Sequence, residues 1–332
     1  MKRLLAFLGI SVALTAVAWA AMIRPGEPAP ILYVAPLYVQ VCQEEAMAGF
    51  TPEQRRAAEF VCAQPHSFWI AEWIASPAEF LEEIFAGAEA AGAIPTIVLY
   101  NIPGRDCSLY AAQEGVVTSA DYLRWIGSVA DAIGNHHVSI ILEPDALAQI
   151  ATVPDCMAAL GWQEERLRLI AFAASMLGEN PNAKVYIDAG NAAWVGARQM
   201  AGLLARAGIE HAAGFALNVS NRVSTTDSIL YGHEISNLVG NKGFVIDTSR
   251  NGAGLPSLEG EAMWCNPPTE ALGDLPTFDT GDPLIHAFLW VKAPGESDGE
   301  CLDSPEEHRG PPAGDIWPER LQSLFERSVY AQ

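Results

Sequence analysis

The stretch VSIILEPDALAQI, residues 138–150, decides how the rest of the chain is interpreted. A nearly uninterrupted apolar run, residues 138–142, leads into Glu143, Pro144 and Asp145, and an apolar pattern then resumes. A short run rich in β-branched residues is typical of a strand that is buried on both faces. The sequence therefore predicts a buried strand with two carboxylates at its C-terminal end.

Similar runs recur along the chain and alternate with segments of helical period. The further apolar runs are residues 31–37, 94–102, 184–190, 214–220, 243–249 and 286–292. The segments with helical period are residues 52–60, 78–91, 120–133, 164–177, 193–207 and 228–238. The first of these helices follows Thr51, which can cap it, and begins with proline. This alternation predicts an α/β fold with a mostly parallel sheet, and so many strands favour a (β/α) barrel over a small open sheet.

The first twenty residues have the pattern of an export signal. Lys2 and Arg3 precede an apolar run, residues 4–18, and Ala18-Trp19-Ala20 offers small residues for cleavage. An uncleaved anchor is the alternative, because the apolar run continues through Ile23 and about 20 apolar residues can span a bilayer. We expect cleavage near Ala20, a single catalytic domain over residues 21–332, and a secreted or periplasmic protein with no membrane contact after cleavage.

Composition limits the possible partners. The chain has 332 residues, 50% hydrophobic and 18% charged, with a formal net charge of -21. Because nucleic-acid binding depends on Lys and Arg that neutralise phosphates, we expect no nucleic-acid partner. A neutral polymer or a small neutral ligand fits this charge better. We also expect the protein to be a monomer.

Six cysteines in an exported chain predict three disulfides. Proximity in sequence suggests the pairs Cys42–Cys62, Cys107–Cys156 and Cys265–Cys301, although other connectivities stay open. Metal ligation is the competing interpretation. We expect no metal site, because no two cysteines have the short spacing of a zinc site and the histidines are scattered.

Polar residues follow the predicted strands at their C-terminal ends. They are Asn101, Arg105, Asp106, Glu143, Asp145, Asp188, Asn218, Asp247, Arg250, Lys292, Glu296 and Asp298. Barrel enzymes assemble their active sites at this end, so these side chains are expected to share one pocket. Carboxylates without a nucleophile–histidine constellation indicate acid–base chemistry on an uncharged substrate, as in glycoside hydrolysis. The alternative for Asp106 and Asp247 is structural pairing with a nearby arginine.

Several tryptophans lie at or beside the same strand ends, where their rings could stack on sugars: Trp69, Trp73, Trp194, Trp264 and Trp290. Any one of them could instead be a core residue, Trp290 above all.

Taken together, these segments resemble glycoside hydrolase family 6, the inverting β-1,4-glucanases that include endoglucanases and cellobiohydrolases. The matching motifs, in the family's order, are YNIPGRDCS (100–108), ILEPDALA (141–148), YIDAGNAAWVG (186–196), GFALNVSN (214–221), VIDTSRNG (245–252), WCNPP (264–268) and LWVKAPGESDGEC (289–301). The resemblance implies a distorted barrel of about seven strands, a β-1,4-glucan substrate and no cofactor.

The resemblance also implies a role for each matching residue. Asp145 is similar to the general acid, and Asp106 to the aspartate that raises the pKa of the acid and holds the hydrolytic water. Asp298 is similar to the proposed base, acting directly or through a water chain. The positions similar to sugar contacts are Trp69, Tyr100, Asn191, Trp194, Asn218, Trp264, Lys292 and Glu296. The pairs Cys107–Cys156 and Cys265–Cys301 resemble family disulfides, whereas Cys42–Cys62 rests on proximity alone.

Three departures bear on activity. Asn191 replaces the family's usual histidine, Ala111 and Ala112 lie where a serine linked to the catalytic water is usual, and Arg222 replaces a usual aromatic residue. The alanines make a non-catalytic or weakly active glucan-binding protein the rival hypothesis. Short connections around the cleft, such as residues 298–301, predict an open cleft and internal cleavage, with an exo-acting cellobiohydrolase as the alternative.

Overall fold

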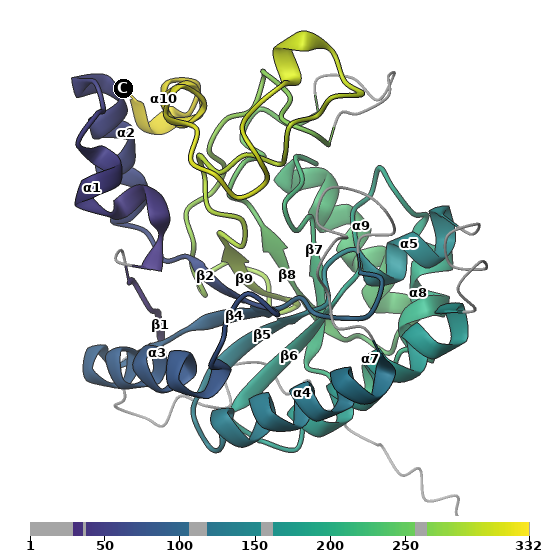
Figure 1. Cartoon of the computed structure of the whole chain (residues 1–332). Helices are drawn as coiled ribbons and strands as arrows, with labels where there is room; N and C mark the ends of the chain where they lie inside the picture. The colour runs from purple at the N-terminus through teal and green to yellow at the C-terminus, as the bar shows by residue number, and fades with distance from the viewer. Residues whose placement is uncertain (1–28, 36–37, 106–117, 154–161, 256–263, 332) are drawn as a thin grey trace, which may run out of the picture.

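One curled parallel sheet forms the centre of the computed structural model, which describes residues 29–35, 38–105, 118–153, 162–255 and 264–331. In spatial order its strands are β2 (Ser67–Ile70), β4 (Thr96–Leu99), β5 (Val138–Leu142), β6 (Ala183–Asp188), β7 (Gly214–Leu217), β8 (Gly243–Asp247) and β9 (Ile285–Leu289). Every neighbouring pair is parallel, and the order in space follows the order in sequence. All the carboxyl ends of the strands therefore lie at one edge (Figure 1).

The two edge strands of this sheet approach each other. The backbone N–H of Ser67, at the start of β2, donates to the carbonyl of Trp290, just after β9, at 3.1 Å. The indole Nε1 of Trp69 donates to the carbonyl of Val291 at 2.8 Å. No ladder pairs β2 with β9 in the described residues, so the sheet is a barrel that is not closed between these two strands. We call this line between β2 and β9 the seam.

Helices cover the outside of the sheet and fill its ends. They are α1 (Glu44–Met47), α2 (Pro52–Cys62), α3 (Pro77–Ala91), α4 (Ser119–Ile133), α5 (Ala146–Thr152), α7 (Trp162–Leu177), α8 (Ala197–Arg206), α9 (Thr225–Leu238) and α10 (Pro318–Glu326). Short 3-10 turns occupy Gln40–Cys42, Ile209–His211, Glu306–His308 and Val329–Ala331. None of the helices within the described part of the chain combines the length and apolarity needed to cross a membrane.

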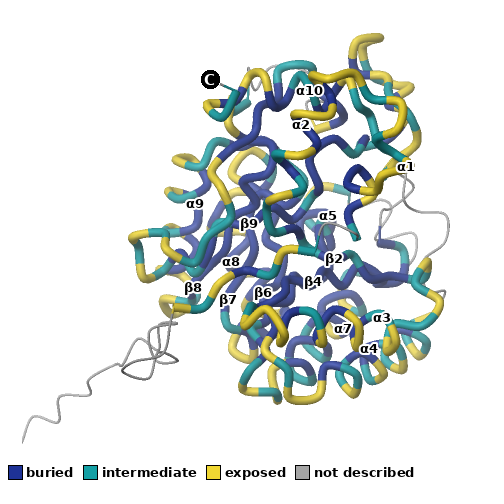
Figure 2. Tube along the Cα trace, turned by 90° about the vertical axis from the view of Figure 1, so that its left-hand side faces the viewer, coloured by how far each residue is buried: buried dark blue, intermediate teal, exposed yellow. Residues whose placement is uncertain are grey.

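Local sequence explains why these helices form where they do. The Thr51 hydroxyl accepts the N–H of Gln54, and the Gln54 side chain accepts the N–H of Thr51, which caps α2 from both directions. In α4 the buried residues recur at helical spacing, so one stripe faces the sheet. The strands β4 and β5 are buried along their whole length, and Figure 2 shows the sheet as the buried centre of the molecule.

The structure confirms the α/β class and the seven parallel strands, but one predicted strand was wrong. Within the described part of the run at residues 31–37, only β1 (Ile31–Leu32) is a strand, and it pairs with β3 (Ala93–Ile94) in a separate two-stranded sheet. Its place is taken by β2, whose sequence SFWI is short and has no β-branched run. The helices α1, α5 and α10 were also not predicted.

A second core lies between the N-terminal helices and the C-terminal helix. Val61 of α2 and Leu321, Leu324 and Phe325 of α10 are buried against one another and against Trp290. Figure 1 shows α1, α2 and α10 side by side beyond one edge of the sheet. This pairing joins the two ends of the described chain and supports the loop that follows β9. The predicted signal lies outside the described residues.

Candidate active site

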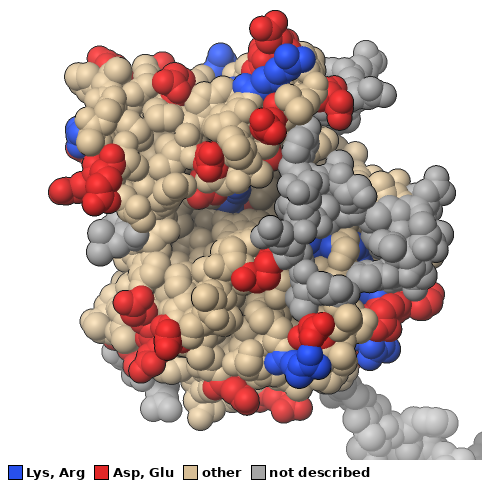
Figure 3. Space-filling model, in the orientation of Figure 1, with Lys and Arg blue, Asp and Glu red and all other residues tan. Residues whose placement is uncertain are grey.

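A cleft with a volume of about 780 Å³ opens at the C-terminal ends of the strands. Figure 3 shows the hollow that crosses the middle of this face of the molecule. The cleft brings together these predicted site residues: Trp69, Tyr100, Asp145, Trp264, Lys292, Glu296 and Asp298. Trp69 lies in β2, and the others come from the connections that follow β4, β5, β8 and β9, so they are far apart in sequence. The expectation that strand ends share one pocket is therefore met for this set.

Asp145 lies three residues after the end of β5, in a backbone conformation that few residues adopt. Its φ of 68° is left-handed, and it begins α5. The backbone N–H of Asp145 donates to Oδ2 of Asp188 at 2.9 Å, which holds this unusual turn in place. Pro144 precedes it and restricts the chain on the other side. The half-buried side chain of Asp145 is thus presented to the cleft from a fixed backbone.

Glu143 supports the loop that follows β4. The carboxylate is fully buried and accepts the backbone N–H groups of Asn101 and Ile102, each at 3.0 Å. Burial raises the pKa of Glu143 to about 7, although these hydrogen bonds lower it. Glu143 therefore connects the end of β5 to the loop of Arg105.

Asp188 and Asp247 are buried beneath the cleft at the ends of β6 and β8. Oδ2 of Asp188 also accepts the N–H of Gly190 at 3.1 Å. Burial, together with the charge of Asp247, raises the pKa of Asp188 to about 7, although its hydrogen bonds to backbone N–H groups lower it. The carboxylate of Asp247 accepts backbone N–H groups from Ser220, Ser249, Val291 and Lys292. Both aspartates thus fix loops around the cleft.

Asp298 is held between two arginines. Its Oδ1 accepts from Arg250 at 2.9 Å, while Oδ2 accepts from Arg222 and from the backbone N–H of Asn266 at 3.0 Å. Burial raises the pKa of Asp298, but Arg222, Arg250 and Lys292 together lower it well below its ordinary value. The side chain is 8% exposed, so Asp298 is an almost buried anion at the edge of the cleft.

Arg222, one of the residues that depart from the family pattern, connects three loops. Its side chain is 1% exposed and forms ion pairs with Glu270 and Asp298. It also donates to the backbone carbonyls of Ser220 and Trp264. These partners lie in the connections that follow β7, β8 and β9. The sequence shows that Arg222 is unusual, but not which residues it pairs with.

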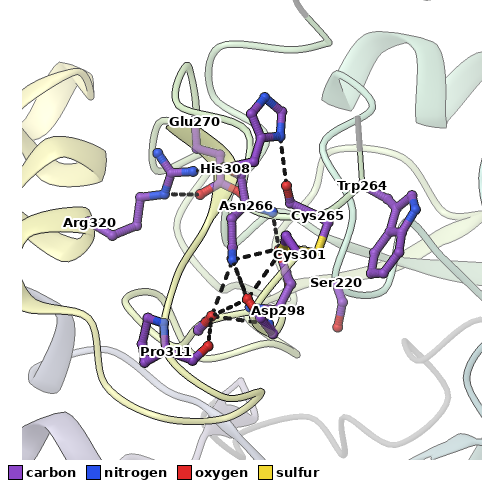
Figure 4. The surroundings of a disulfide bond; sticks show 12 residues. Ser220, Trp264, Cys265, Asn266, Glu270, Asp298, Cys301, His308, Pro311 and Arg320 are labelled. Atoms are coloured by element: carbon purple, nitrogen blue, oxygen red, sulfur yellow. Dashed lines mark hydrogen bonds and ion pairs between the residues drawn. A yellow bond between two sulfur atoms is a disulfide. The ribbon is translucent and has the colours of Figure 1, made fainter. Parts of the chain in front are cut away.

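A disulfide ties the loop of Trp264 to the loop of Asp298. Cys265 and Cys301 are bonded with their Cα atoms 6.0 Å apart, as expected (Figure 4). Beside them the Asn266 amide donates to the carbonyl of Gly299 at 2.8 Å, and Asn266 Oδ1 accepts the N–H of Asp298 at 2.8 Å. Trp264, 41% exposed, is therefore held close to the predicted base.

The disulfide Cys42–Cys62 is also formed and joins the turn at residues 40–42 to the end of α2. Cys107 and Cys156 lie outside the described residues, as do Asp106, Ala111 and Ala112.

Aromatic and charged groups complete the cleft walls. Trp69 contacts Tyr100 edge to face, with ring centroids 5.5 Å apart. Lys292 Nζ and Glu296 Oε2 form an ion pair at 2.9 Å. Trp290 is a buried core residue, as its alternative interpretation held, and its Nε1 donates to the carbonyl of Asp274.

Three predicted sugar contacts are absent from the residues that line the cleft. Asn218 is fully buried, and its amide bonds backbone groups of Asp247 and Val223, so here it shapes its own loop. Asn191 is buried and accepts the N–H of Ala193, while the indole of Trp194 donates to the Thr152 hydroxyl at 3.0 Å. These interactions with nearby loops could not be inferred from motif spacing.

Glu72 was not predicted from the sequence as a site residue. It pairs with Arg105, whose side chain lies in the cleft wall. Its position two residues after β2 could have marked it as a strand-end residue. That indication was missed because β2 itself was not predicted. Within the described residues no cluster of three or more His, Cys, Asp or Glu side chains is arranged to hold a metal ion.

Several known proteins are similar to this chain in sequence or in structure. Endoglucanase A of Cellulomonas fimi is 42% identical over 263 residues, which cover 79% of this chain and 54% of the relative. Endoglucanase 1 of Streptomyces sp. (strain KSM-9) is 38% identical over 270 residues, 79% of this chain and 73% of the relative. The chain thus spans about half of the first relative and about three-quarters of the second.

A solved structure of the endoglucanase Cel6 from Mycobacterium tuberculosis, in complex with methyl-cellobiosyl-4-deoxy-4-thio-β-D-cellobioside, superposes with a TM-score of 0.81. It is 37% identical, and the match covers 90% of this chain and 97% of that one. The model of the family Glycosyl hydrolases family 6 matches residues 30–328, which include every strand of the sheet and the whole cleft. This chain therefore belongs to glycosyl hydrolases family 6.

Proposed function

We propose that this chain hydrolyses internal β-1,4-glucosidic bonds of cellulose or a related β-glucan, with inversion at the anomeric carbon. The observation that carries the proposal is that Asp145 and Asp298 line one cleft together with partly exposed tryptophan rings. Inverting glycosidases use one carboxyl group as acid and another as base, with room for a water molecule between them. The similarity to proteins named as endoglucanases supports the same reaction.

Asp145 acts as the general acid. Its carboxyl group gives a proton to the glycosidic oxygen, the bond between this oxygen and the anomeric carbon breaks, and the leaving chain departs as an alcohol. A water molecule attacks the anomeric carbon from the opposite face and loses one proton. The product then carries the α configuration at its new reducing end.

Asp298 receives that proton through a water chain in our proposal. Both of its carboxylate oxygens already accept hydrogen bonds from Arg222, Arg250 and Asn266, which favours transfer through water over direct contact. Its lowered pKa keeps it ionised before this transfer, so it provides a negative charge at the edge of the cleft towards which the proton moves. Asp106, proposed from its motif alone, raises the pKa of the acid and helps to hold the water.

Binding of the glucan is assigned to the remaining matched positions. Those that line the cleft are Trp69, Tyr100, Trp264, Lys292 and Glu296. Asn191, Trp194 and Asn218 are proposed from their motifs alone. Internal cleavage is proposed because Gly299 and Glu300 alone separate Asp298 from Cys301, which leaves little chain there to roof the cleft. Secretion is proposed from the N-terminal signal pattern, and the two disulfides fit an oxidising compartment.

The proposal is tested on cellohexaose with the anomer of the fresh product read by proton NMR. We expect α-anomer from the native chain and at least a hundredfold lower rate from Asp145→Asn, because a good general acid contributes about 10² to 10⁴ in rate. The matched control is Asp279→Asn, the same change at an exposed position away from the cleft, which should keep the native rate.

Release of β-anomer would contradict inversion and the role of Asp298. Binding without any release by the native chain would instead favour the non-catalytic glucan-binding protein. On a soluble long glucan, viscosity should fall early relative to new reducing ends. Slow viscosity loss with cellobiose as the main early product would indicate exo action.

A further inference from the structure

Trp73 is an exposed aromatic residue of the cleft to which the family resemblance assigns no role. It lies four residues beyond Trp69, in the turn that follows β2. Its exposed fraction is 51%, and it is among the residues that line the cleft. The turn is closed by a hydrogen bond from the N–H of Ile74 to the carbonyl of Ala71 at 3.1 Å. The backbone that carries the indole is therefore fixed.

The Arg105 guanidinium holds the indole of Trp73. The guanidinium carbon lies 5.1 Å from the centroid of the Trp73 ring and 4.9 Å from that of Tyr100. Arg105 is itself buried, with hydrogen bonds to Oε1 of Glu72 at 2.7 Å and to the carbonyl of Tyr100 at 3.0 Å. A cation at this distance from an aromatic face is attracted to it. Trp73 is thus pre-oriented, although half of its surface remains open.

The charges around Trp73 suit a neutral ligand. Arg105 and Glu72 form an ion pair, so the support beneath the indole carries no net charge. The exposed surface of Trp73 is apolar and flat, which matches the C–H face of a pyranose ring. Because the indole is already ordered, little side-chain entropy is lost when a ligand covers it.

We propose that Trp73 forms an outer subsite that stacks one further glucosyl unit of a β-1,4-glucan, beyond the unit that contacts Trp69. The inference rests on the proposed function, since it takes the same polymer as ligand. An outer subsite increases the affinity for long glucan chains but not for chains too short to reach it. It therefore favours cleavage within a polymer over removal of cellobiose from an end.

Calorimetric titration with cellotriose and cellohexaose tests this subsite. The chain carries Asp145→Asn throughout, so that no ligand is consumed, and is compared with and without Trp73→Ala. We expect Trp73→Ala to weaken cellohexaose binding about tenfold, or about 1.4 kcal/mol, and to leave cellotriose binding unchanged. Trp73→Phe should restore most of the cellohexaose affinity, because it keeps a flat ring. Leu230→Ala, which truncates an exposed apolar residue of α9 outside the cleft, is the matched control.

Two results would overturn the subsite. An equal loss for both oligosaccharides would show that Trp73 supports the inner site, and unchanged affinity for both would show that its ring does not contact the glucan. Failure of the parent Asp145→Asn chain to bind either oligosaccharide would contradict the proposed function itself, and the subsite with it. The ratio between the two ligands thus tests Trp73, whereas binding by the parent tests the function.

Discussion

Arg222 links Asp298, the proposed base, to the part of the cleft wall that carries Trp264. One side chain is paired with Asp298 and also donates to the backbone carbonyl of Trp264. A buried arginine at such a junction fixes geometry through several charge-assisted bonds at once. We therefore treat Arg222 as a positioning residue, and it should affect both kcat and KM.

Arg222→Met is expected to lower kcat/KM about 10- to 100-fold, the scale of the loss when a second-layer partner of a catalytic group is removed. With one cation fewer, the pKa of Asp298 rises, so its ionised fraction falls first at low pH. The acidic limb of the kcat/KM profile should therefore move to higher pH, and Arg222→Lys should restore part of the shift. Arg198→Met, at an exposed arginine of α8, is the control. A lower melting temperature with an unchanged pH profile would show that Arg222 stabilises the fold without positioning Asp298.

For single residues, the sequence predicts where a side chain lies in the fold better than it predicts which residues that side chain bonds. Asp145 could be placed at a strand end because an apolar run leads directly to it. The contacts of Arg222 could not, because its bonds to Trp264 and Asp298 span 42 and 76 residues. The burial of Asn218 was missed for the same reason, since its amide bonds the carbonyl of Asp247 across two loops.

Among the elements, the disulfide-linked loops after β8 and β9 form one wall of the cleft. Replacing both Cys265 and Cys301 by serine should lower the free energy of unfolding by about 2–4 kcal/mol. It should also raise KM for cellohexaose, because the loop of Trp264 is released from the loop of Asp298.

The same double replacement at Cys42 and Cys62 is the comparison. This bond lies in the second core, and neither cysteine is among the residues that line the cleft. We therefore expect a similar decrease in the free energy of unfolding, with KM unchanged. If both pairs change KM equally, the Cys265–Cys301 bond has no special effect on the cleft.

Strand prediction failed at β2 for a physical reason. Its four residues show no periodicity, and its extended form depends on pairing with β4, from Ser67 with Thr96 to Ile70 with Leu99. The run at residues 31–37 has the better local pattern, but its strand β1 pairs with β3 and not with a strand of the main sheet. Tertiary pairing therefore overrides local preference at both positions.

For the whole molecule, the buried carboxyl groups predict how stability depends on pH. The pKa values of Glu143 and Asp188 are raised by burial to about 7 in the folded chain. Between about pH 4 and pH 7 the unfolded chain loses these protons while the folded chain keeps them. The free energy of unfolding should thus be greatest near the acidic end of this window and fall as the pH rises through 7.

Melting temperatures measured across this window check the prediction. Glu143→Gln should flatten the decline, because the amide does not ionise and still accepts hydrogen bonds. Glu179→Gln, at an exposed glutamate, should leave the slope unchanged. A melting temperature that rises steadily toward pH 7 would contradict the assigned direction.

The seam between β2 and β9 has a topological consequence for the substrate. A barrel closed by a full ladder would hold the loops after its first and last strands together. Here the Ser67 amide and the Trp69 indole bridge the described edges, and Trp69 and Lys292 on either side of the seam line the cleft. Under the proposed function, a glucan chain with no free end nearby would then enter the cleft from the side, without being threaded.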